Sequence, residues 1–103
     1  MKTSHWINVE PLPTPFPAKR LLHSSRADLV HLHLPAGDAI TPHGNDVDVI
    51  FHVLQGDGLL TLDAETEQLN AGDSVFIEKN ALRGWRAAPD GKGLTLLAVK
   101  LLD

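Results

Sequence analysis

The sequence has no cysteine and no run of lysine or arginine. The missing cysteines exclude disulfide bonds, thiolate catalysis and zinc sites built on thiolates. The formal net charge is −4 with neutral histidines, and a chain without a basic cluster is poorly suited to bind nucleic acid or an anionic membrane. We therefore expect neither nucleic acid nor a membrane as a partner.

Long hydrophobic segments are also missing. The longest apolar stretch, residues 94–102, is too short to cross a membrane and is interrupted by Lys100. No apolar stretch of the signal-peptide type follows Met1 and Lys2, so we expect a cytoplasmic protein. Of the 103 residues, 43% are hydrophobic and 21% charged, which predicts one globular domain over residues 1–103.

The clearest structural signal lies in residues 47–58, VDVIFHVLQGDG. Apolar residues alternate with others at a period of two, which is typical of a strand with one face in a core. The face predicted to point inward carries Val47, Val49, Phe51 and Val53, and the outer face carries Asp48, Ile50, His52 and Leu54. Glycines at positions 56 and 58 indicate a tight turn, so residues 47–54 and 59–63 are predicted to form a hairpin.

Several other short segments are predicted to be strands. Residues 29–34 alternate, and we expect Val30, Leu32 and Leu34 to point inward while His31 and His33 point outward. Further strands are expected at residues 5–10, 19–23, 74–78, 82–87 and 94–102.

The remaining segments connect these strands. Every second residue of the segment 11–17 is proline, which excludes a helix or a central strand. We expect an extended arm on the surface, with Leu12 and Phe16 covering an edge of the core. Residues 38–46 are predicted to be a loop.

Residues 63–72 fit two structures. Asp63 could cap a short helix, which the local signals slightly favour, or a tight turn could lead into a strand at residues 67–69. Many short strands, frequent turn signals and no convincing long helix together predict an all-β domain, either a sandwich or a small barrel.

Two segments resemble the paired sequence motifs of the cupins. Residues 37–45 (GDAITPHGN), followed by Val49 and then HVLQGDG, resemble the first motif, and residues 72–85 (GDSVFIEKNALRGW) resemble the second. The resemblance implies a small cupin-type jelly-roll barrel, also called a double-stranded β-helix. Residues 37–85 would carry the motifs, and residues 1–28 would form an N-terminal arm and edge strands. It also favours a turn and a strand within residues 63–72.

The residues that bind metal in cupins are mostly replaced here. Of the family's two histidines and glutamate in the first motif and histidine in the second, the resemblance retains His43 alone. The other positions hold Asn45, Val49 and Arg83. Arginine is a permanent cation and only donates hydrogen bonds. We therefore expect no metal and no other cofactor.

The same replacements suit a different guest. Arg83 presents a fork that matches a carboxylate or phosphate, and His43 and Asn45 can add hydrogen bonds. This predicts a pocket for an anionic or polar small molecule, with Val49, Phe51 and Val53 as an apolar wall and Trp85 as a stacking surface. Alternatively, Arg83 could turn outward and pair with Asp46 or Asp48 at the rim.

Three functions remain open from the sequence. The favoured one is a small-molecule-binding cupin that is not an enzyme. The second is a metal-dependent cupin enzyme, a dioxygenase or isomerase, with a rebuilt site of His43, His31 and His33. The third is a structural or storage role for a barrel filled by side chains.

The predicted outer face carries more apolar surface than one small barrel can cover. Ile50, Leu54 and one side of residues 94–102 contribute to it. Exposed apolar strand surface is a common site of subunit association, so we expect a homodimer.

Overall fold

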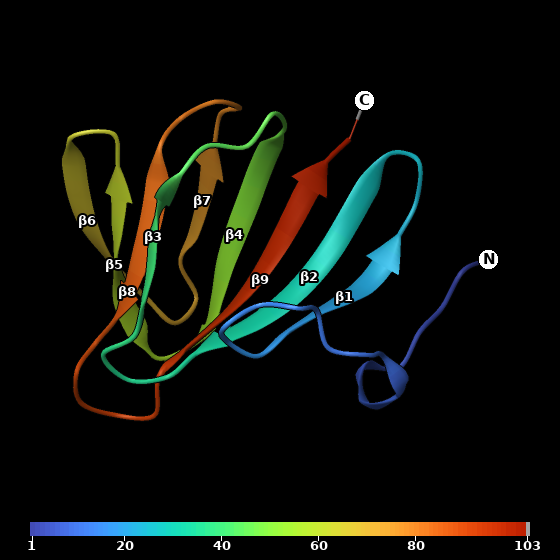
Figure 1. Cartoon of the computed structure of the whole chain (residues 1–103), viewed down its shortest axis with the longest axis horizontal. Helices are drawn as coiled ribbons and strands as arrows, with labels where there is room; N and C mark the ends of the chain where they lie inside the picture. The colour runs from blue at the N-terminus through green and yellow to red at the C-terminus, as the bar shows by residue number, and fades with distance from the viewer. Residues whose placement is uncertain (103) are drawn as a thin grey trace.

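Two antiparallel β-sheets face each other in the computed structural model, which describes residues 1–102 (Figure 1). The larger sheet has the strand order β1-β2-β9-β4-β7, and the smaller has the order β3-β8-β5-β6. The nine strands of the described residues are β1 (Ala18–His23), β2 (Ala27–Leu34), β3 (Ala39–His43), β4 (Asp48–Gln55), β5 (Asp57–Leu62), β6 (Glu65–Asn70), β7 (Ser74–Ile77), β8 (Arg83–Ala87) and β9 (Leu94–Leu101). This arrangement confirms the predicted all-β jelly roll.

The core fills the space between the two sheets. In β4, Val49, Phe51 and Val53 are buried, as the alternation predicted. In β2, the buried residues are Val30, Leu32 and Leu34, and the histidines between them are only partly buried. The smaller sheet contributes Leu60, Leu69, Trp85 and Ala87 to the same core.

The predicted hairpin of residues 47–54 with residues 59–63 was wrong, because β4 pairs with β7 and β9 in the larger sheet, whereas β5 pairs with β6 and β8 in the smaller sheet. The tight turn that the glycines indicated does connect the two strands, and it leads from one sheet to the other. This turn depends on Gly56. Its φ of 79° lies in the left-handed region that glycine adopts without strain. A Cβ atom at this position would lie 2.0 Å from the Gly93 carbonyl oxygen, so the turn also needs the missing side chain.

The structure of two other segments also differs from the prediction. Residues 5–10 do not form a strand, because Trp6–Asn8 is a 3₁₀ helix in which Nδ1 of His5 accepts a hydrogen bond from the Ile7 amide at 3.3 Å. Residues 38–46 are not only a loop, because they contain β3, which pairs with β8. Pro42 is tolerated there because β3 lies at the edge of its sheet, and the pairing is irregular between Ile40 and His43.

The ambiguous segment 63–72 forms a turn and a strand, so the helix that local signals favoured was wrong. Asp63 adopts a φ of 53°, and β6 then pairs with β5 along its whole length. The Asp63 carboxylate accepts a hydrogen bond from the Leu82 amide at 3.2 Å instead of capping a helix. Pairing with the free edge of β5 therefore outweighs the local helix preference.

The proline-rich segment runs as the predicted arm. Pro11 forms an isolated bridge with Lys19 of β1, and Leu12 and Phe16 pack against the core. Among the described residues, none forms a helix long and apolar enough to cross a membrane.

A continuous apolar row crosses the outer face of the larger sheet. Strand pairing places Leu22, Leu29, Val99, Ile50 and Phe76 side by side on β1, β2, β9, β4 and β7. Phe76 is 52% exposed, and the other four are partly buried. We propose that this row is the contact surface of a homodimer, because exposed apolar strand surface is a common site of subunit association and a two-fold axis can bring two copies of the same row together.

Light scattering at micromolar concentration is expected to give twice the mass of one chain. Phe76→Glu should reduce this to the mass of a monomer, because it would bury a carboxylate in the contact. Leu82→Glu is the matched control, since Leu82 is equally exposed at 53% but lies outside the row. A monomeric mass for the unaltered protein would contradict the proposal.

Candidate ligand site

A cavity of about 220 Å³ lies between the sheets, next to the N-terminal arm. Its apolar walls come from the arm and from β2, β3, β4 and β9, and include Phe16, Leu32 and Phe51. Its lining also contains five polar or charged residues: Thr14, His43, Asn45, Arg83 and Lys100. None of the lining residues carries a carboxylate, so the charge that faces the cavity is positive.

Arg83 is the least expected member of this lining. It begins β8, where it pairs with His43 of β3 and Leu62 of β5. Only 3% of the residue is exposed, and the guanidinium carbon lies 5.7 Å from the centre of the Phe51 ring. Nη1 is buried without a hydrogen-bond partner among the described residues.

The electrostatic state of Arg83 follows from this position. Burial lowers the pKa of its guanidinium, but arginine remains protonated in proteins. The alternative in which Arg83 pairs with Asp46 or Asp48 at the rim is wrong, because the side chain points inward. The Asp48 carboxylate instead accepts a hydrogen bond from the Lys79 amide at 2.8 Å. A buried cation in residues 1–102 therefore faces a cavity without a paired carboxylate.

Four other predicted site residues also line the cavity: His43, Asn45, Val49 and Phe51. Val49 is fully buried and Phe51 nearly so, which makes them the expected apolar wall. Val53, the third residue predicted for this wall, is buried in the core but does not line the cavity. Nδ1 of the exposed His43 lies 3.1 Å from the Thr41 carbonyl oxygen. If Nδ1 carries the proton it donates to that oxygen, and Nε2 stays available as an acceptor.

Trp85 does not line the cavity. Its ring packs edge-on against Phe51, with ring centres 5.3 Å apart and an interplanar angle of 73°. Trp85 is 3% exposed, and its indole Nε1 is buried without a partner in the described part of the chain. The residue therefore supports the cavity wall from behind and offers no stacking surface to a ligand.

Lys100 is a lining residue that the sequence analysis missed. It follows Leu94, Leu96 and Ala98 on the inward face of β9, at the end of a series with a period of two. The same alternation places Lys100 inside, so its position could have been predicted from the sequence.

The residues around Arg83 do not fit a divalent metal ion. His43 offers one ring nitrogen and Asn45 a neutral amide oxygen, while Val49 offers no lone pair. The unpartnered Nη1 of Arg83 is a positively charged donor, and it would repel a cation placed beside it. Residues 1–102 contain no group of three or more histidine, aspartate or glutamate side chains that could hold a metal.

The rebuilt histidine site is not assembled either. His31 and His33 alternate with buried residues of β2, so they lie on its outer face, while His43 lines the cavity between the sheets. The alternative ligand set His43, His31 and His33 is therefore wrong, because the larger sheet separates its members.

The family model described as the cupin domain matches residues 30–100. The chain belongs to the cupin domain family. A search of curated proteins gave no match.

Several solved cupin structures share the fold. An RmlC-like cupin from Shewanella frigidimarina is 18% identical with a TM-score of 0.87, over 100% of this chain and 92% of that chain. KdgF from Halomonas sp. is 20% identical with a TM-score of 0.84, over 100% and 96%. The polyketide cyclase RemF from Streptomyces resistomycificus is 21% identical with a TM-score of 0.84, over 100% and 80%. At this identity they establish the architecture alone.

Replacing Arg83 by methionine should stabilise the protein without ligand. The change removes an unpartnered buried cation and keeps a long side chain, so the free energy of unfolding should rise by about 1–3 kcal/mol. Urea denaturation measures this value. Arg86→Met is the matched control on the same strand, because Arg86 is exposed, and it should change stability by less than about 0.5 kcal/mol. A loss of stability in Arg83→Met would show that the guanidinium is already compensated.

Proposed function

We propose that this cupin is a small-molecule-binding protein whose cavity takes a small carboxylate with an apolar body. The observation that carries the proposal is the Arg83 side chain, which is buried at the cavity with Nη1 unpartnered. A charged donor in this state is costly until a ligand pairs with it. A carboxylate is the simplest ligand that matches the guanidinium fork.

The charged residues around the cavity favour a negatively charged ligand. Arg83 on β8 and Lys100 on β9 are the charged lining residues, and no acidic side chain joins them. Coulomb attraction in a partly desolvated site is stronger than in water. Asn45 and Thr14 add neutral hydrogen-bonding groups at the same cavity, so the carboxylate can be held by more than one contact.

The walls support an apolar body on the same ligand. Val49 and Phe51 from β4 and Val30 and Leu32 from β2 face the cavity. Its volume of about 220 Å³ lies below the range of about 300–1,000 Å³ that drug-sized ligands occupy. The proposed guest is therefore a short-chain or single-ring acid.

A catalytic role is not part of this proposal. The donor set around Arg83 does not suit a divalent metal, and none of the lining residues carries a carboxylate that could act together with His43 as a second acid or base. The polyketide cyclase among the structural relatives is about one-fifth identical to this chain, which carries over the fold and no reaction.

The test uses the full chain and the series acetate, butyrate and hexanoate, with binding measured by calorimetry or NMR. Affinity should rise along the series by roughly fourfold for each methylene that is buried. Arg83→Met should weaken hexanoate binding about tenfold or more, because it removes a charge-assisted hydrogen bond.

Two controls separate charge from hydrophobicity. Arg86→Met should leave hexanoate binding unchanged, since Arg86 is exposed on the opposite face of β8. Hexanol should bind more weakly than hexanoate to the unaltered protein and about equally to both proteins. The proposal fails if hexanoate binds Arg83→Met as tightly as it binds the unaltered chain.

A further inference from the structure

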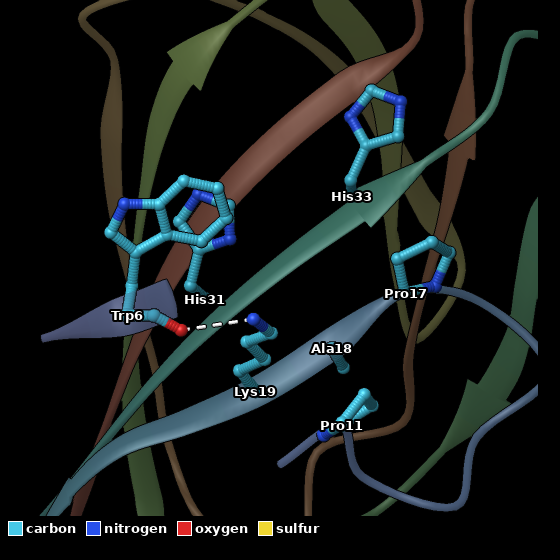
Figure 2. A pocket seen from close by; sticks show the side chains of 7 residues that line it. All are labelled: Trp6, Pro11, Pro17, Ala18, Lys19, His31 and His33. Atoms are coloured by element: carbon cyan, nitrogen blue, oxygen red, sulfur yellow. Dashed lines mark hydrogen bonds between the residues drawn. The ribbon is translucent and has the colours of Figure 1, made fainter. Parts of the chain in front are cut away.

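A second pocket of about 210 Å³ lies where the N-terminal segment crosses the outer face of the larger sheet (Figure 2). Trp6 and Pro11 come from the N-terminal segment, Lys19 comes from β1, and His31 and His33 come from the outer face of β2. The histidines that the interior site does not use therefore belong to a separate pocket.

Trp6 forms a fixed aromatic wall of this pocket. Nζ of Lys19 donates a hydrogen bond to the Trp6 carbonyl oxygen at 2.9 Å and lies 4.9 Å from the centre of the indole ring. The ring also faces His31, with centres 6.4 Å apart and an interplanar angle of 31° (Figure 2). Although it is held by these contacts, Trp6 remains 58% exposed, so it offers an ordered surface for stacking.

The titratable residues that line the pocket are all basic: Lys19, His31 and His33. The pKa of His31 is lowered by burial first, and then by the neighbouring His33 and Lys19. His31 is consequently uncharged at neutral pH, and Lys19 supplies the positive charge. An ammonium group has three donors, and the bond to Trp6 uses one, so two remain for a ligand.

The two histidines are poorly placed to chelate a metal together. Nδ1 of His33 lies 2.9 Å from Oγ1 of Thr95, which occupies that nitrogen. The opposite edge of the ring lies against Gly93, where an added Cβ would be 2.8 Å from Nε2. The pocket therefore offers donors to an anion more readily than lone pairs to a cation.

We propose that this outer pocket is a second binding site, separate from the interior cavity, for a small planar anion such as an aromatic carboxylate. The ring of the ligand lies on Trp6 and on the faces of Pro11 and Pro17. The carboxylate accepts hydrogen bonds from Lys19. The volume of about 210 Å³ suits a single ring, since it lies below the range of drug-sized ligands.

Benzoate is the probe, titrated into the full chain while the histidine and indole resonances are followed by NMR. The resonances of His31 and Trp6 should shift together with one dissociation constant. Lys19→Met and Trp6→Leu should each weaken this binding by about tenfold. Lys92→Met is the matched control, because Lys92 is an exposed loop residue outside the pocket, and it should have no effect.

Two further comparisons distinguish this site from the interior cavity and test its shape. Arg83→Met should leave the benzoate-induced shifts of His31 and Trp6 unchanged. Cyclohexanecarboxylate has the same charge but no flat ring, so it should bind more weakly than benzoate at this site. The proposal is overturned if Lys19→Met and Trp6→Leu bind benzoate like the unaltered chain, or if Arg83→Met alone abolishes the shifts.

The pH dependence gives an independent readout. A bound carboxylate beside His31 favours its protonated form, so the pKa of His31 should rise in the complex. The neighbouring charged groups are Lys19 on β1 and His33 on β2, while the residues paired with the two histidines on β9, Leu97 and Thr95, do not titrate. Benzoate affinity should therefore increase as the pH falls through the titration of His31, and Lys19→Met should retain that trend from a weaker starting affinity. An unchanged His31 pKa in saturating benzoate would contradict the proposal.

Discussion

The packing of the two sheets against each other is the constraint on which the structure depends. Each strand contributes alternate residues to the space between the sheets, and these must be apolar for the sheets to stay together. The edge-on contact between Phe51 and Trp85 joins β4 to β8 across this space. At the interior cavity two inward positions are not apolar, because they hold Arg83 on β8 and Lys100 on β9.

A single set of substitutions has two chemical consequences at this place. Val49 offers no lone pair to a divalent ion, and Arg83 adds a fixed positive charge beside it. The same charge, surrounded by apolar side chains, is the basis of the proposal that the cavity binds an anion. The poor fit to a metal ion and the proposed fit to an anion therefore have one explanation, since both follow from the guanidinium of Arg83 and the isopropyl group of Val49.

The sequence predicts a structural feature well when the residues that determine it are close together in the chain, and poorly when they are far apart. The inward residues of β2 and β4 follow from alternation alone, because one face of each strand lies in the core. The direction of Arg83 could have been taken from the same rule, since Trp85 and Ala87 continue its face of β8. Because Arg83 is charged, the sequence analysis also allowed an outward orientation at the rim.

Other features depend on contacts between segments that are distant along the chain. Residues 65–70 form a strand because they pair with the edge of β5. Residues 39–43 form β3, although they include a proline, because they pair with the edge of β8. No local pattern carries this information. The outer pocket is the strongest case, because it exists only once the N-terminal segment docks on β1 and β2 and brings Trp6 next to His31.

The position of β9 has a consequence for how the protein folds during synthesis. Among residues 1–102 this strand is the last of nine in sequence order, yet it lies in the middle of the larger sheet between β2 and β4. Until residues 94–101 have left the ribosome, β1 and β2 cannot join β4 and β7, and each pair exposes an unpaired edge. The larger sheet therefore cannot be completed before β9 is available, and until then the apolar faces of its two halves stay exposed to water.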